Sequence, residues 1–264
     1  MNDNDKITNA PALFDLSDRV VIVTGGGSGI GKIYSQRLAA CGVSVVAADL
    51  AQEHAEGVAK EIRNCGGHAV GISVDVSDEA ATLRMTEKAL SEFGRIDGLI
   101  NNAALMSALP RRPWHEISVD EWDRVMAVNL RGMFLCCRAV FPQMRKQGKG
   151  AIVNISSTRA FDGTPNRLHY TTSKAGVIGF TRALAREVGE YAIRVNAIAP
   201  GLTLSETQLA SSTPSYLEAL AKGRALVRPQ VPEDLIGAVL FLLSDASAYM
   251  TGQTMSIDGG KVMH

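Results

Sequence analysis

Three side chains whose types and spacing fit proton transfer lie in one stretch of the chain. Tyr170 precedes Lys174 by four positions, and twelve residues separate Ser157 from Tyr170. On a helix, a spacing of four brings two side chains onto one face. An ammonium there would stabilise a phenolate and lower the pKa of the tyrosine from its ordinary value near ~10. The Ser157 hydroxyl, after an apolar run, would hold a carbonyl or alkoxide oxygen, so the three residues predict acid/base chemistry on an alcohol.

A glycine-rich turn follows the first apolar run of the chain. The run Val20 to Val23 leads directly into the segment TGGGSGIG at 24–31, behind which helical spacing resumes. This order is typical of a strand, a tight turn and a helix. Glycines permit positive φ and let a phosphate chain approach the backbone amides and the positive helix end, although an ordinary turn also uses them. The candidate cofactor-binding residues of this segment are Gly25, Ser28, Gly29 and Ile30.

An acidic residue closes the second apolar run. Val43 to Ala48 end in Asp49, eighteen residues after Gly31, close to where a dinucleotide fold places an acid on the adenosine ribose. A carboxylate accepts hydrogen bonds from a ribose diol but repels a 2′-phosphate, and no Arg or Lys directly follows Asp49. We therefore predict NAD rather than NADP as the cofactor. The alternative is that Asp49 only caps the end of the strand.

Together these motifs resemble the short-chain dehydrogenase/reductase family, from about Arg19 to Gly260. TGGGSGIG is similar to the cofactor loop TGxxxGIG of the family. The residues that match its catalytic tetrad are Asn129, Ser157, Tyr170 and Lys174. The resemblance implies that Tyr170 and Lys174 also contact the cofactor. It further implies cofactor contacts from Asp75, Val76, Asn102, Ala103, Pro200 and Gly201, and from Thr203 in place of a family threonine where this chain has Ser205.

Asn129 has two interpretations. It lies in an expected helix over 119–147, where Trp122, Met126 and Met133 recur with it at helical spacing. A buried amide needs partners, so Asn129 fits a satisfied core residue that bends the helix. The resemblance implies instead that it holds a water linking Lys174 to bulk solvent. Both interpretations remain open at this point.

The resemblance also places a substrate pocket after the fourth strand, after Ser157 and in the segment near 201–230. Our candidates there are Met106, Arg159, His169 and Leu204. The surrounding residues are more apolar than a sugar site requires. Arg159 would pair with a carboxylate or phosphate on the substrate, or is a solvated surface residue. His169 would add a second acid/base group, but the ~100° step from Tyr170 favours a ring that faces solvent.

Composition restricts the class of protein. The chain has 264 residues, 46% of them hydrophobic, which suits one domain over 1–264. Lys plus Arg equals Asp plus Glu at 27 each, so no charge imbalance favours nucleic acid or an anionic membrane as a partner. The polar start has no apolar signal region and no run approaches ~20 apolar residues, so we expect a cytoplasmic protein. The four cysteines lack metal-ligand spacing, and no metal is expected.

Apolar runs alternate with helical stretches along the whole chain. Strands are expected near 19–24, 43–48, 69–74, 97–101, 151–155, 193–198 and 254–257. This alternation predicts an α/β fold of the Rossmann type, a doubly wound, mostly parallel seven-stranded sheet with helices on both faces. The cofactor then lies at the carboxyl ends of the strands, where their order reverses. Residues 1–16 are expected to form an arm, and 201–230 a partly helical substrate lid.

The predicted function is reversible hydride transfer between NAD and a secondary alcohol or ketone. An aryl, alicyclic or polyol alcohol oxidised in catabolism is the expected substrate. The alternatives are a sugar dehydrogenase, an NADPH-type 3-ketoacyl thioester reductase and a non-catalytic NAD-binding protein. Apolar positions in excess on the helix over 119–147 and on the helix of Tyr170, with the family resemblance, suggest a homotetramer, although such positions also thicken a core.

Overall fold

Seven parallel strands form the central sheet of this computed structural model, which describes residues 13–106, 109–205, 209 and 212–263. They are β1 Val20–Thr24, β2 Ser44–Asp49, β3 Ala69–Ser73, β4 Gly98–Asn101, β5 Gly150–Ile155, β6 Ile193–Pro200 and β7 Thr254–Ile257. Their order in the sheet is β3-β2-β1-β4-β5-β6-β7, and every pairing is parallel. The predicted fold class is confirmed, and each strand begins and ends within two residues of its expected position.

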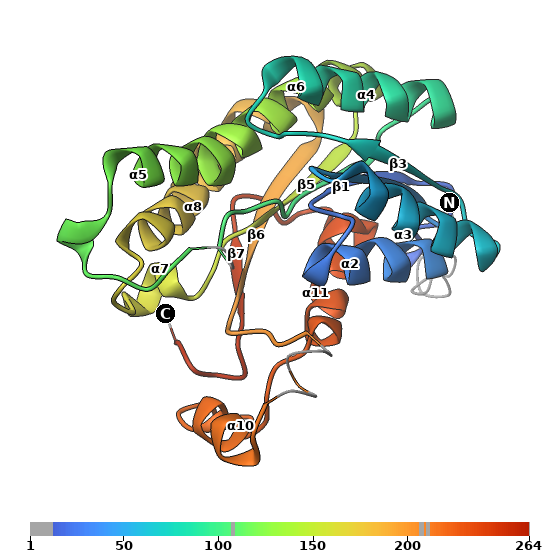
Figure 1. Cartoon of the computed structure of the whole chain (residues 1–264). Coiled ribbons are helices and arrows are strands. Elements are labelled where there is room, and N and C mark those ends of the chain that lie inside the picture. Colours follow the sequence, from blue (N-terminus) through green and yellow to red (C-terminus); the bar gives the residue numbers. More distant parts are fainter. Residues whose placement is uncertain (1–12, 107–108, 206–208, 210–211, 264) are drawn as a thin grey trace.

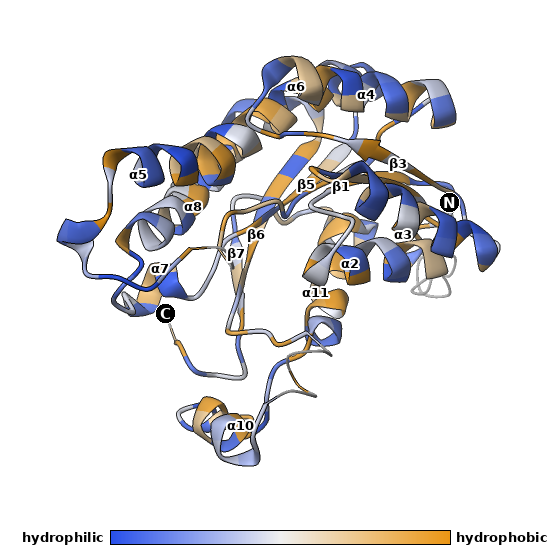
Figure 2. Cartoon of the chain, viewed as in Figure 1, coloured by the Kyte–Doolittle hydropathy of each residue, from blue (hydrophilic) through white to orange (hydrophobic). Residues whose placement is uncertain are grey.

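The strands are apolar because both faces of the sheet are buried. In β1, Val20 and Ile22 belong to the core on one face, whereas Val21 and Val23 belong to the core on the other. Side chains alternate between faces along a strand, so a strand covered on both sides needs an unbroken apolar run. Figure 2 shows this concentration of hydrophobic residues along the strands and the polar residues on outer helices such as α5 (Val119–Met126).

Helices cover both faces of the sheet (Figure 1). Besides α5, the α-helices are α2 Gly29–Ala40, α3 Gln52–Asn64, α4 Glu79–Phe93, α6 Gly132–Gln147, α7 Arg159–Asp162, α8 Leu168–Val188, α10 Pro214–Ala221 and α11 Ile236–Leu243. Short 3-10 turns lie at Trp114–Glu116, Gly189–Tyr191, Pro232–Leu235 and Asp245–Ser247. Helices α4, α6 and α8 pack on one face, and α2, α3 and α11 on the other.

The expected helix over 119–147 is interrupted. A π-helical turn at Ala127–Arg131 joins α5 to α6, and Asn129 lies in its middle. Such turns insert one residue per turn into an α-helix and are frequent at functional sites. Among the described residues, the segment Val119–Gln147 is long enough, and apolar enough in its average composition, to cross a membrane. Half of its most apolar window is buried inside the domain, as in the core helix of a soluble protein.

Two expected appendages are only partly described. Of the predicted arm, residues 1–12 lie outside the described residues, and Leu16 is buried in the core, so an arm reaching residue 16 is wrong. Of the predicted lid, 206–208 and 210–211 lie outside them. Its described part contains the helix α10 and a bridge between Thr203 and Gln230. That this segment closes over a substrate remains a prediction.

The strand order reverses between β1 and β4. From β1 the chain proceeds to β2 and β3 on one side, then returns to β4 on the other. Ligands of doubly wound sheets bind at such a point, outside the carboxyl ends of the strands. Here those ends are followed by the glycine turn after Thr24 and by Asn102 after β4, so the two motifs meet at one edge.

Candidate active site

The glycine turn is held against the end of β4. The Thr24 hydroxyl accepts hydrogen bonds from the backbone amides of Asn102 and Ala103, at 3.0 and 3.1 Å. The Asn102 side chain donates to the carbonyls of Thr24 and Gly25, at 3.0 and 3.3 Å. These bonds fix the turn at the place where the strand order reverses. The sequence patterns predict both segments, but the contact between them is tertiary.

The turn is also shaped for an anion. Gly25 and Gly29 have φ of +62° and +52°, a conformation that L side chains rarely adopt. At Gly29, nothing lies within 4 Å of where a Cβ would stand. Ser28 precedes α2, and within the described part of the chain its side chain caps none of the first amides of that helix. Free amides at a positive helix end fit a phosphate group, so the turn fits a dinucleotide.

We expect Gly31→Ala to destabilise the protein by about 2 kcal/mol or more, as overpacking does in a tight site. A Cβ at Gly31 would collide with the Gly25 carbonyl oxygen and stand 2.6 Å from Asn102 Nδ2. The matched control is Gly57→Ala on α3, where nothing lies within 4 Å and a gain of up to ~1 kcal/mol is expected. Urea denaturation of both variants measures the difference, and equal stabilities would contradict the steric argument.

Asp49 lies beside this turn. Its Oδ2 accepts from the Gly27 amide at 3.0 Å, and its Oδ1 accepts from the Ala51 amide at 3.2 Å. The second bond matches the alternative of a strand-end cap, and the first ties the carboxylate to the glycine turn. A carboxylate oxygen accepts more than one hydrogen bond, so Asp49 keeps capacity for a ribose hydroxyl.

The remaining cofactor candidates also lie at strand ends. Asp75 is exposed, and its Oδ1 accepts from both the amide and the hydroxyl of Ser77, at 2.8 and 2.7 Å. Val76 is buried in the core. Pro200 ends β6, the Gly201 amide donates to the Ile257 carbonyl at 2.9 Å, and Thr203 donates to the Gly201 carbonyl at 3.1 Å.

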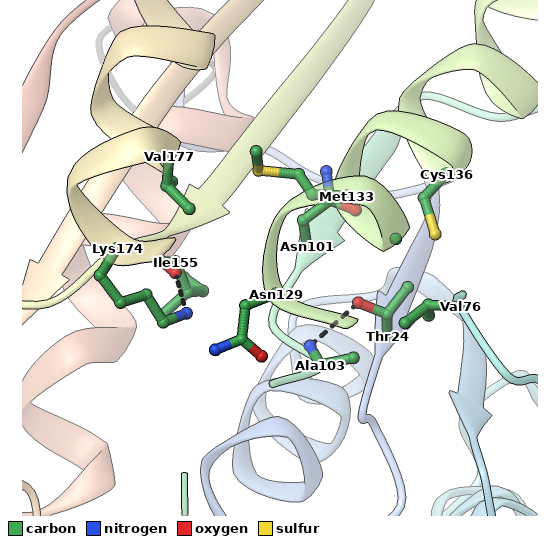
Figure 3. Close-up of a pocket in the computed structure, with 11 residues that line it drawn as sticks. Thr24, Val76, Asn101, Ala103, Asn129, Met133, Cys136, Ile155, Lys174 and Val177 are labelled. Carbon is green, nitrogen blue, oxygen red and sulfur yellow. Dashed lines mark hydrogen bonds between the residues drawn. The ribbon is translucent and has the colours of Figure 1, made fainter. Parts of the chain in front are cut away.

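The predicted tetrad converges at the end of β5. Ser157 follows that strand, and both Tyr170 and Lys174 are buried on α8, at 8% and 3% exposure. Lys174 Nζ lies 5.8 Å from the centre of the Tyr170 ring, so the two groups share one face of the helix as the spacing predicts. The Lys174 ammonium donates to the Ile155 carbonyl at 2.6 Å (Figure 3).

A small cavity joins this group to the glycine turn (Figure 3). It measures about 10 Å³, room for roughly one water molecule. Thr24, Ala103, Asn129 and Lys174 all line it. The cavity therefore connects the start of the cofactor loop, the end of β4 and the tetrad.

Comparisons with known proteins show the family to which the chain belongs. The model of a family described as enoyl-(acyl carrier protein) reductase matches residues 25–261. A 3-oxoacyl-[acyl-carrier-protein] reductase of Thermotoga maritima is 39% identical over 94% of this chain and 99% of its own. A cis-4-hydroxycyclohexanecarboxylate dehydrogenase of Sinomonas cyclohexanicum is 38% identical over 92% and 96%. The chain belongs to the short-chain dehydrogenase/reductase family.

A solved structure of the same family supports the fold. A 7α-hydroxysteroid dehydrogenase, complexed with NADH and 7-oxo glycochenodeoxycholic acid, matches with a TM-score of 0.88 and 31% sequence identity. The match covers 96% of this chain and 98% of that chain. This short-chain dehydrogenase/reductase therefore has its relatives' architecture over nearly its whole length.

In this short-chain dehydrogenase/reductase, the electrostatics of Tyr170 and Lys174 differ from the sequence-based expectation. Burial raises the pKa of Tyr170, against a hydrogen bond with Ser157 and the positive charges of Arg159 and Arg167, which lower it. The expectation that Lys174 lowers this pKa is not met, because the cost of burying a phenolate prevails and Arg159 and Arg167 are the opposing charges. Burial lowers the pKa of Lys174 itself to about 8.

The buried lysine predicts how stability depends on pH. Its pKa is about 8 in the folded chain against an ordinary value of 10.5 for lysine, so between these pH values the unfolded chain binds more protons. Stability must then rise with pH in that window and stay constant below it. Relative to Lys174→Met, we expect the wild-type free energy of unfolding to increase by ~3 kcal/mol across the window. Denaturation at a series of pH values measures it, and a constant difference would contradict the assignment.

Asn129 is a fully engaged buried amide. Its Oδ1 accepts from the Leu105 amide at 2.7 Å, and its Nδ2 donates to the Leu105 carbonyl at 3.2 Å and to the Ser173 hydroxyl at 3.1 Å. The interpretation as a satisfied core residue at a bend is thus supported. Because Asn129 also lines the cavity beside Lys174, the water-holding interpretation stays a prediction.

His169 is placed differently from both expectations for it. Its ring is fully buried, and Nε2 lies 2.9 Å from Glu121 Oε1 on α5. A solvent-facing ring is therefore wrong, because α5 packs against this side of α8 (Figure 1). The position in the substrate pocket is not supported either, since the ring contacts a neighbouring helix.

Of the other pocket candidates, Met106 lies beside Tyr170. Met106 packs against an apolar cluster of Leu109, Val125 and Tyr170. Leu204 is buried, and its amide donates to the Gln230 carbonyl at 2.8 Å. Sequence reasoning missed Arg167 and the Ile155 carbonyl. Arg167 could have been found from the sequence, because it stands three residues before Tyr170. A backbone carbonyl has no residue type that a sequence pattern could identify.

Proposed function

We propose that this short-chain dehydrogenase/reductase transfers a hydride reversibly between NAD and a secondary alcohol or ketone. The observation that carries the proposal is the cavity shared by Thr24 of the glycine turn and Lys174 of the tetrad. The cavity places Lys174 beside the start of the glycine turn, and Lys174 in turn lies 5.8 Å from the ring of the buried Tyr170. The tyrosine lies too deep for a surface role, at 8% exposure.

Each side chain of the site has a role in the oxidation of an alcohol. In its phenolate form, which the hydrogen bond from Ser157 favours against burial, Tyr170 accepts the hydroxyl proton, and Ser157 holds the same substrate oxygen. The alcohol carbon gives up its hydrogen with both electrons as a hydride and becomes a ketone carbon, and the nicotinamide of a bound NAD would accept that hydride. The nicotinamide supplies the hydride chemistry that no amino-acid side chain provides. In the reduction of a ketone, Tyr170 returns the proton.

Lys174 supports the site through its charge. Its ammonium is fixed by the Ile155 carbonyl, close to the Tyr170 ring, and would bind the nicotinamide ribose. The proton taken up by Tyr170 would pass to Lys174 and from there to a water in the adjoining cavity. Asn129, which also lines the cavity, would hold that water. The glycine turn would hold the pyrophosphate, and Asp49 the adenosine ribose, which favours NAD over NADP.

The substrate is proposed to be an alicyclic or aryl alcohol rather than a polyol. Tyr170 belongs to an apolar cluster with Leu109 and Val125, and Leu105 and Met106 pack against it. Apolar side chains around the reacting group favour a hydrocarbon ring over a sugar. Two similar proteins are named for ring alcohols or bind a ring ketone, the hydroxycyclohexanecarboxylate dehydrogenase and the hydroxysteroid dehydrogenase.

A 3-ketoacyl thioester reductase is the second candidate. It is favoured by the 39% identity to the Thermotoga maritima reductase and by the description of the matching family. The Asp49 carboxylate opposes it, because such a reductase of the NADPH type needs a site for the 2′-phosphate. A comparison of NADPH with NADH in the reduction of a 3-ketoacyl thioester separates the two candidates.

The test is a screen of alcohols in which the absorbance of NADH measures the reduction of NAD. It includes cyclohexanol, 4-hydroxycyclohexanecarboxylate, 4-hydroxycyclohexanecarboxamide, a benzylic secondary alcohol, galactose and a polyol. Turnover of ring alcohols with NAD supports the proposal. Turnover of galactose or the polyol alone would favour the sugar alternative, and NAD binding without any turnover would favour a non-catalytic NAD-binding protein.

We also propose that the protein is a cytoplasmic homotetramer. Between α6 and α8 lies an apolar hollow of about 370 Å³, lined by Phe134, Phe141, Phe180 and Leu184 among others. Phe134 is 44% exposed, as a subunit contact requires. Met133 and Ile178, apolar positions on the same two helices, are buried within the chain and leave the contact to residues such as Phe134. Sedimentation equilibrium measures the assembly.

A further inference from the structure

Two arginines, Arg159 and Arg167, lie near Tyr170, and a third, Arg111, lies near Arg167. Arg159 opens α7 two residues after Ser157, and its amide donates to the Ser157 hydroxyl at 3.3 Å. Arg167 is the residue before α8. Arg111 follows the segment after β4 and is exposed. The catalytic role proposed above uses none of these three side chains.

Hydrogen bonds hold two of the guanidinium groups in place. Arg159 Nη1 donates to the Thr164 carbonyl at 3.1 Å. Arg167 donates from Nη1 to Met106 Sδ and from Nη2 to the Leu109 carbonyl, both at 3.0 Å. Met106 and Leu109 also contribute to the apolar cluster around Tyr170. Arg167 therefore contacts two residues of the apolar region beside Tyr170. Its buried Nε has no hydrogen-bond partner among the described residues.

The charges of these arginines act on one another and on the phenol. Burial, followed by the positive charges of Arg159 and Arg111, lowers the pKa of Arg167. The charges of Arg159 and Arg167 lower the pKa of Tyr170, against the burial that raises it. In the described parts of the chain, no carboxylate forms an ion pair with any of the three. Arg112, by contrast, pairs with Glu121 at 3.4 Å.

Like charges that repel one another and partly lose their water are stabilised by one anion between them. Guanidinium groups are suited to this because they present fixed pairs of donors to the two oxygens of a carboxylate. A function limited to tuning Tyr170 would leave the cations unpaired. A substrate anion would pair them and would also orient the hydroxyl toward Tyr170.

We propose that the substrate is a secondary alcohol that carries a carboxylate, which Arg159 and Arg167 bind while the ring lies on the apolar cluster beside Tyr170. Arg111 adds attraction at the entrance of the pocket. This inference rests on the proposed function and narrows its substrate class. It joins an apolar ring site to an anion site in one pocket.

The test compares 4-hydroxycyclohexanecarboxylate with its uncharged carboxamide. In the wild type, kcat/KM should be about 10- to 100-fold higher for the carboxylate, as for a hydrogen bond to a charged group. Arg159→Gln and Arg167→Gln should each lower this ratio toward one, mainly through KM of the carboxylate, and Arg159→Lys should restore part of it. Because an altered Tyr170 affects both substrates alike, the ratio isolates the binding of the anion.

A matched control and a binding measurement keep the outcomes distinct. Arg182→Gln removes an exposed arginine further along α8 and should leave the ratio unchanged. Equal kcat/KM for both compounds in the wild type, or unchanged ratios in Arg159→Gln and Arg167→Gln, would overturn the inference while the proposed function stands. If neither alcohol is oxidised, the proposed function fails for this ring. Calorimetric titration with cyclohexanecarboxylate and cyclohexanecarboxamide then decides the anion site alone, with preference for the carboxylate supporting it and no preference overturning it.

Discussion

Tyr170→Phe should lower kcat by about 10³-fold for the best alcohol found in the NAD screen, the scale of general acid/base catalysis. The substitution removes only the hydroxyl that exchanges a proton with the substrate. The ring stays in the apolar cluster with Leu109 and Val125, so the fold and NADH binding should be retained. Steady-state rates and NADH fluorescence titration measure the two effects separately.

The chain offers a matched control for this variant. Tyr34 on α2 is fully buried in the core, and burial raises the pKa of its phenol as it does for Tyr170. Its hydroxyl has no hydrogen-bond partner among the described residues, so Tyr34→Phe should keep wild-type turnover. A Tyr170→Phe enzyme within a few-fold of the wild type would refute the acid/base role. Equal losses in both variants would point to a general effect of buried phenols.

Asp49→Asn should lower the preference for NAD over NADP by roughly 30- to 100-fold, expressed as the ratio of kcat/KM for the two cofactors. A carboxylate and a 2′-phosphate ~4 Å apart repel by ~4 kcal/mol at an effective dielectric constant of ~20, and solvent at this half-buried position reduces that figure. The amide keeps one oxygen as an acceptor for the Gly27 amide, so the glycine turn should retain its shape.

Asp75→Asn makes the same change of charge at the end of β3. The family resemblance expects Asp75 near the adenine, where NAD and NADP do not differ. The control should therefore alter both cofactors equally and leave their ratio constant. An unchanged ratio in Asp49→Asn would show that the Asp49 charge does not select the cofactor.

Much of the fold follows from patterns that are local in the chain. The apolar run of β1 and the glycines behind it identify a strand and its turn, because burial on both faces and positive φ each restrict the residue type at a position. The four-residue step from Tyr170 to Lys174 places both on one face of α8, as observed. Helix geometry alone is enough for that.

The partners of the site residues are not local. Lys174 bonds to the Ile155 carbonyl, whose position depends on the packing of α8 against β5. His169 is buried because α5, some 48 positions earlier, supplies Glu121. Asn129 lies in the π-helical turn, and its side chain forms hydrogen bonds to Leu105, 24 positions earlier in the chain. None of these pairings has a periodicity that a sequence pattern reveals.

The sequence by itself determined which residues can do chemistry and in which order the strands and helices follow, since spacing and backbone stereochemistry act within a few residues. Only the tertiary structure decided the electrostatics. Burial governs the pKa values of Tyr170 and Lys174, and the charges of Arg159 and Arg167 act on Tyr170 from the two ends of the short connection between α7 and α8. Electrostatic energy depends on distance and on exclusion of water, and both are properties of the folded chain.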